Sequence, residues 1–155
     1  MEVLFLKIMS KTSGGTRPRD LNKNDLNKAF DLALEFNDPF KVYLKSYIFQ
    51  NAFDLGNYEE AEIHLKDYLH DINQIPKSFH GTAWLDASIF YSFAKNDLTN
   101  SEYFYKKFIP SSFVPKAQIY LAEALLEKLK NNYEDAKLKK NLAKNELPNM
   151  LDRGM

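Results

Sequence analysis

The chain of 155 residues contains no cysteine, which excludes disulfide bonds and zinc sites with thiolate ligands. A chain without such cross-links must be stabilised by a hydrophobic core, and 45% of its residues are hydrophobic. That length and that fraction are typical of one folded domain. The lack of cysteine also fits a reducing compartment, so we expect a cytoplasmic protein.

Glycine and proline are scarce, with five and six residues respectively. Turn-rich β folds need more of both, whereas long stretches rich in leucine, lysine, glutamate and alanine are typical of helices. The composition therefore predicts an all-α fold.

An excess of charge of one sign is also missing, because 21 basic residues balance 21 acidic ones. Lysines do gather near the end of the chain, but acidic residues lie among them, and we interpret this stretch as a solvated helix surface with partial ion pairing. No arginine occurs between Arg19 and Arg153, although arginine is the residue best suited to phosphate recognition. We therefore expect no nucleic-acid partner. The lysines are Lys128, Lys130, Lys137, Lys139, Lys140 and Lys144.

No apolar run reaches the roughly 18 to 20 residues that a membrane-spanning helix needs. Residues 3–9, VLFLKIM, are apolar but short, and they lack the cleavage site of a signal peptide. Residues 10–20 combine serine, threonine, glycine and proline without a hydrophobic period, which is typical of a linker. We expect residues 1–20 to form an N-terminal arm.

Four similar segments follow the arm and begin at Asn24, Gly56, Asn96 and Asn131, at intervals of 32, 40 and 35 residues. Glycine or asparagine tolerates the left-handed conformation that ends a helix, and an asparagine or aspartate after it can cap the next helix. In each segment a small residue follows, which allows close packing of the preceding helix. These small residues are Ala29, Ala61, Ser101 and Ala136.

The segments resemble the tetratricopeptide repeat, a helix–turn–helix unit of about 34 residues. Gly56, Tyr58 and Ala61 match the start of its second helix. The resemblance covers residues 24–150, and the last copy matches it at Tyr133, Ala136, Ala143 and Pro148. The departures are Phe49 in place of a small residue, Ser101 in place of alanine, and a longer loop in the interval of 40 residues.

The resemblance implies antiparallel helical hairpins stacked as an α-solenoid of about seven helices over residues 21–150, followed by a tail at 151–155. We expect Pro76, Pro110 and Pro115 to separate the hairpins. The expected helices are 24–37, 40–54, 58–72, 81–95, 98–109, 115–130 and 133–146.

In the family that the chain resembles, the first helix of each hairpin lines a concave groove that binds peptides or partner helices. The implied groove is rich in aromatic residues and has no lysine or arginine clamp, which suits an apolar or mixed peptide better than an acidic one. Its expected residues are Tyr43, Ser46, Gln50, Phe53, Asp86, Phe90 and Gln118, with Ala83, Phe93, Leu121 and Leu125 beside them.

Catalytic and metal-binding patterns are not found. His64 and His70 lie six residues apart, which is unlike a zinc-binding pair on one helical turn, and we expect His80 in a loop. Asp67 and Asp71 share a helix face, which we interpret as solvated. We expect no catalytic residue, no metal and no cofactor.

The leading functional hypothesis is a non-catalytic scaffold or adaptor that binds a protein or peptide. The alternative is a cytosolic regulatory tail of a membrane-embedded enzyme such as a site-2-type protease. It rests on the apolar residues 3–9 and on the nearby cations Lys7, Lys11, Arg17 and Arg19, since positive charge gathers on the cytoplasmic side of membrane segments.

Overall fold

A computed structural model describes residues 22–37, 40–108 and 114–152. Over these ranges the chain forms seven α-helices and two short 3-10 helices, with no strand. The all-α prediction is confirmed. The chain divides into two compact units with the boundary between Ile75 and Pro76.

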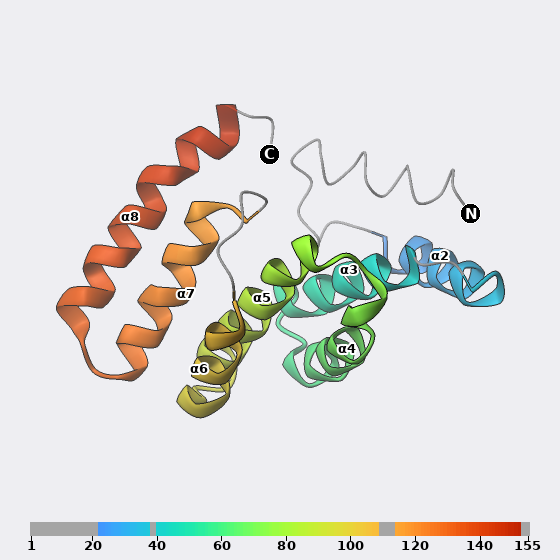
Figure 1. The fold of residues 1–155 in the computed structure, drawn as a ribbon, viewed down its shortest axis with the longest axis horizontal. Helices are drawn as coiled ribbons and strands as arrows, with labels where there is room; N and C mark the ends of the chain where they lie inside the picture. Colours follow the sequence, from blue (N-terminus) through green and yellow to red (C-terminus); the bar gives the residue numbers. More distant parts are fainter. Residues whose placement is uncertain (1–21, 38–39, 109–113, 153–155) are drawn as a thin grey trace. The chain divides into compact units, whose positions relative to one another are not determined.

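The first unit contains α2 (Lys23–Glu35), α3 (Phe40–Asp54), α4 (Tyr58–His70) and the 3-10 helix η2 (Ile72–Gln74). Helix α3 packs against both α2 and α4 (Figure 1). The Asn22 side chain caps α2 by accepting hydrogen bonds from the first backbone N–H groups of that helix. The α2–α3 contact buries the apolar residues Leu26, Ala29, Ala33 and Leu44.

The second unit contains the 3-10 helix η3 (Lys77–Phe79), α5 (His80–Phe93), α6 (Leu98–Lys107), α7 (Lys116–Leu129) and α8 (Tyr133–Asp152). Helices α7 and α8 run antiparallel, and α5 packs against both α6 and α7 (Figure 1). The Asp97 side chain caps α6 by accepting from the backbone N–H of Asn100 at 3.0 Å. Packing within this unit is therefore mainly between chain neighbours, with the α5–α7 contact added.

The predicted helix limits agree with the observed ones to within two residues, except at the end of α8. That helix continues to Asp152, whereas the sequence predicts an end at residue 146. The expectation that His80 lies in a loop is wrong, because it is the first residue of α5. Pro76 and Pro115 precede helices as expected, while Pro110 and the arm at 1–20 lie outside the described residues.

Three of the four predicted left-handed turn residues are confirmed by positive φ angles: 80° at Gly56, 51° at Asn96 and 62° at Asn131. The prediction for Asn24 is wrong, since this residue lies in the first turn of α2. Asn37, with φ of 49°, adopts the left-handed conformation just after α2 instead.

The α3–α4 and α7–α8 turns use the same backbone hydrogen bonds. The N–H of Asn57 donates to the carbonyl of Ala52 at 2.9 Å, and the N–H of Asn132 donates to the carbonyl of Glu127 at 2.9 Å. In both turns this bond spans five residues and closes the end of the first helix around the left-handed residue. At two of the four segments, the repeated sequence pattern thus has a repeated local conformation.

The small residue of each segment is fully buried in three of the four cases: Ala29, Ala61 and Ser101. Ser101 also exchanges hydrogen bonds with Ser88 of α5, its Oγ donating to the Ser88 carbonyl at 2.9 Å. The expectation that Ala136 is tightly enclosed is wrong, because its side chain is half-buried. Helix α8 packs chiefly against α7, which leaves the sides of α8 open.

Candidate functional site

The predicted groove residues on α3 share one face of that helix. Tyr43, Ser46, Gln50 and Phe53 are spaced by three or four residues, and all four are half-buried. The Phe53 ring stacks on Phe49 with centroids 5.8 Å apart and meets Tyr58 of α4 at 6.0 Å. This face combines aromatic side chains with a hydroxyl and an amide.

The remaining predicted residues lie in the second unit, where two of them are in direct contact. The Gln118 amide of α7 donates a hydrogen bond to Asp86 Oδ1 of α5 at 2.7 Å. Phe93 lies seven residues after Asp86 and is 57% exposed, and Leu121 lies three residues after Gln118 and is 43% exposed. These spacings place each apolar side chain on the same side of its helix as the polar one. We call Asp86, Phe93, Gln118 and Leu121 the α5–α7 surface.

Phe90 does not belong to this surface, and the prediction that it is exposed is wrong. Its side chain is fully buried, and its ring meets Tyr91 edge-on at 5.4 Å. Ala83, predicted beside the groove, is also fully buried. The reason is that α5 is enclosed on several sides, with every residue from 87 to 92 buried.

A buried ammonium group that the sequence analysis missed connects α3 to α4. Lys45 Nζ lies 2.7 Å from Asp67 Oδ1 and 2.7 Å from Asp71 Oδ2, and its side chain is only 8% exposed. Its ammonium also lies over the Phe30 ring of α2, 5.8 Å from the centroid. The interpretation of Asp67 and Asp71 as solvated is wrong for Asp71, whose side chain is 17% exposed, but holds for Asp67, whose side chain is 51% exposed. Two carboxylates four residues apart, opposite a lysine in an apolar helix, are the signal that could have identified the contact.

Electrostatic interactions favour the ionised forms of Lys45 and Asp71. The hydrogen bond from Lys45 lowers the pKa of Asp71 below its ordinary value, against the opposing effect of burial. Burial lowers the pKa of Lys45, but the bonds to Asp67 and Asp71 outweigh it and raise the pKa overall. A protonated amine is not a nucleophile, so the arrangement acts as a cross-link between helices rather than as a reactive lysine.

A pocket of about 450 Å³ lies among α6, α7 and α8. Tyr105 donates a hydrogen bond to Glu123 Oε1 at 2.8 Å, and the Lys139 ammonium lies 2.5 Å from Glu123 Oε2 in an ion pair outside hydrogen-bond geometry. Burial and the bond to Glu123 raise the pKa of Tyr105, and the contact with Glu123 raises that of Lys139. Lys130 pairs with Glu102 at 2.9 Å. The expected partial ion pairing is confirmed for Lys130 and Lys139, which line this pocket.

The histidines occupy separate places. His64 Nε2 lies 3.4 Å from Glu60 Oε1, and His70 Nδ1 lies 3.0 Å from Asp71 Oδ1. Within the described ranges no three metal-ligating side chains come together. The helices in these ranges are also too short or too polar to cross a membrane. Residues 3–9, which carry the alternative hypothesis, lie outside the described residues.

Comparisons with protein-family models, with curated proteins and with solved structures found no match for the chain. The tetratricopeptide resemblance therefore rests on the chain's own repeated segments. Three observations bear on this resemblance: the helix limits, the left-handed turn residues and the buried small residues of these segments.

Proposed function

We propose that the protein is a non-catalytic interaction module of stacked helical hairpins of the tetratricopeptide type, working in the cytoplasm. It binds a peptide or partner helix through the α5–α7 surface. The observation that carries the proposal is the hydrogen bond between Gln118 and Asp86, because it joins two predicted groove residues from different hairpins.

The chemistry of the α5–α7 surface supports binding of a mixed apolar segment. Phe93 and Leu121 offer exposed apolar area on the two helices, and a partner that covers them gains from their removal from water. Asp86 adds a carboxylate, with the Gln118 amide fixing one of its oxygens. The surface therefore suits a neutral or basic segment with apolar anchors better than an acidic one.

The repeat assignment is supported by local geometry in both units. The α3–α4 and α7–α8 turns have the same pattern of backbone hydrogen bonds, and the small residues of three segments are fully buried. Stacked hairpins of this kind present the first helix of each pair on one side. Helices α5 and α7 are the first helices of their hairpins, and they contact each other.

Affinity capture from the native cell tests the proposal with the full chain as bait. The test variant combines Phe93→Ala with Leu121→Ala, and the control is Ile63→Ala, which removes an even more exposed apolar side chain from α4. Anchor residues of an interface contribute more than about 1 kcal/mol each, so we expect the double variant to retain less than about one-fifth of the captured partner. The control should retain it. Equal recovery by the wild type and the double variant contradicts the proposal.

A further inference from the structure

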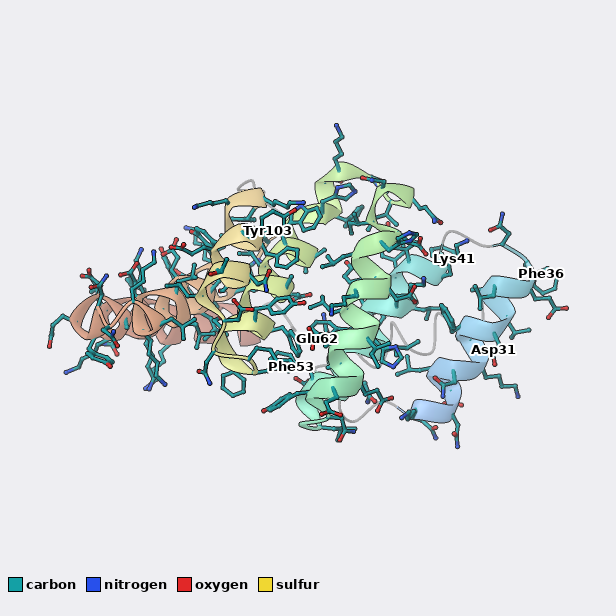
Figure 2. All side chains as sticks on the ribbon, turned by 90° about the horizontal axis from the view of Figure 1, so that it is seen from below. Asp31, Phe36, Lys41, Phe53, Glu62 and Tyr103 are labelled. Atoms are coloured by element: carbon teal, nitrogen blue, oxygen red, sulfur yellow. The ribbon has the colours of Figure 1, made fainter. Side chains whose placement is uncertain are left out.

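A cluster of aromatic rings on α5 and α6 holds the ammonium group of Lys107. Its Nζ atom lies 4.8 Å from the Trp84 ring centroid and 4.7 Å from that of Tyr103. Both distances fall within the roughly 6 Å at which a cation is attracted to an aromatic face. We call these two rings the Trp84–Tyr103 cage; Figure 2 labels Tyr103 on α6.

The cage is built on a packed support. The Phe104 ring stacks on Trp84 at 6.2 Å and 14° and on Tyr91 at 5.5 Å and 10°. Tyr103 meets Phe104 edge-on at 5.0 Å. Because Tyr91 is buried, the Trp84 ring is supported from within the unit, and the two cage rings are pre-arranged around a cation.

The ammonium group of Lys107 can be replaced in the cage by an external cation. Tyr103 is 52% exposed and Lys107 is exposed, so the Lys107 side chain can leave the rings without any change in the core. A cation–π contact at an exposed site is weak. An external cation that binds the rings better than a primary ammonium therefore displaces Lys107.

We propose that the Trp84–Tyr103 cage binds a lysine side chain of a partner segment, and binds it most tightly when that lysine is trimethylated. The present occupant is itself a lysine, so the site already accepts an alkyl stem with a cationic head. A trimethylammonium group cannot donate hydrogen bonds and is weakly hydrated, which makes aromatic faces its preferred surroundings. None of the residues of the α5–α7 surface takes part, so binding at the Trp84–Tyr103 cage can be tested independently of binding at that surface.

Tryptophan fluorescence tests the site directly, because Trp84 is the single tryptophan of the chain. The probe is the acetylated, amidated form of trimethyl-lysine. Its neutral control carries a tert-butyl group in place of the trimethylammonium group. We expect a saturable change in Trp84 fluorescence with the cationic probe and at least about tenfold weaker binding of the neutral one.

Variants of the internal occupant sharpen the test. Lys107→Met keeps the stem and removes the competing charge, so the probe should bind about three- to sixfold more tightly. Lys107→Arg keeps a cation that stacks on aromatic rings and should give no such gain. Tyr103→Ala should weaken binding of the probe and leave the thermal melting temperature of the protein unchanged, because the Tyr103 side chain is exposed. Equal binding of the neutral and cationic probes, or an unchanged affinity of the cationic probe for Lys107→Met, overturns the proposal.

Discussion

Lys45 shows how a single charged residue can be buried without loss of the fold. An ammonium group taken out of water is costly unless it is paired and hydrogen-bonded. Here both requirements are met by Asp67 and Asp71, each at 2.7 Å. Because the lysine lies on α3, while Asp67 lies on α4 and Asp71 follows the last residue of α4 as its C-cap, the cluster links the two helices of one hairpin.

Replacing this lysine should destabilise the protein. Lys45→Met removes both hydrogen bonds and leaves two carboxylates facing an apolar side chain, so we expect a loss of about 1.5–3 kcal/mol. Urea unfolding measures the loss. Lys41→Met on the same helix is the matched control, since the Lys41 ammonium donates a hydrogen bond to the neutral amide of Asn37 at 2.9 Å. It should change stability by less than about 0.5 kcal/mol. An unchanged midpoint for Lys45→Met contradicts the structural role of the cluster.

The pH dependence of that difference follows from the pKa shifts. Asp71 has a folded-state pKa below its ordinary 3.8, so its contribution is present above about pH 3.8 and is lost as the pH falls through the folded value. Lys45 has a folded-state pKa above its ordinary 10.5, so its contribution is present below about pH 10.5 and is lost as the pH rises through the folded value. The stability gap between wild type and Lys45→Met should therefore be widest near neutral pH and close in strong acid. A gap that is constant down to pH 2 would contradict this account.

Two alanines at equivalent positions of the repeated segments should respond differently to enlargement. Ala61 is fully buried and Ala136 is half-buried. Ala61→Leu should overpack the α3–α4 contact and cost about 1–3 kcal/mol, whereas Ala136→Leu should cost less than about 0.5 kcal/mol. Thermal melts of the two variants decide the point. Equal losses would mean that the two helix crossings are equally tight, contrary to the observed burial.

At the scale of elements, the turns are where local sequence most directly determines backbone conformation. Gly56 and Asn131 both end a helix in the left-handed region, with φ of 80° and 62°. Asparagine tolerates that region better than other residues with a side chain, and glycine enters it without steric cost.

Substitutions at these two turns should have different effects on stability. Gly56→Ala forces a Cβ atom into the left-handed region and should cost about 1 kcal/mol, although the space around the new atom is open. Asn131→Gly should be neutral within about 0.5 kcal/mol, because glycine accepts the same φ. Denaturant unfolding of both variants provides the measurement. A neutral Gly56→Ala would show that this turn can close in another conformation.

Helix limits were predictable because their signals are local. Asp97 caps α6 by accepting a hydrogen bond from a residue three positions further along the chain, and Pro115 directly precedes α7. Gly56 adopts a left-handed conformation just after the end of α3. The end of α8 was not predicted, since Pro148 indicates a stop that the helix passes on its way to Asp152.

Side-chain environments were harder to predict because they depend on distant residues. The partners of Lys45 lie 22 and 26 residues further along the chain, so the residues next to Lys45 do not identify the carboxylates that it binds. Phe90 was placed on the groove by its position in the repeat, but α5 is buried almost all round. A helix with apolar residues on every side has no period that identifies its exposed face.

At the scale of the whole molecule, neutral net charge and all-helical architecture suit a protein that works through its surfaces. Balanced charge provides no long-range attraction to polyanions, which leaves short-range contacts to select partners. Two such surfaces are proposed, both in the second unit. The α5–α7 surface offers apolar anchors, and the Trp84–Tyr103 cage offers a site for an alkylated cation.

The most direct test of the central claim is photo-crosslinking in the native cell, with benzoylphenylalanine placed singly at Phe93, at Leu121 or at Ile63. The first two positions belong to the α5–α7 surface, and the third lies on α4 and is more exposed than either. Crosslinks form only where a partner covers the reactive ring. The account predicts one protein partner crosslinked from the Phe93 and Leu121 positions and not from the Ile63 position. The opposite pattern, or the same partner from all three positions, would contradict binding through the α5–α7 surface.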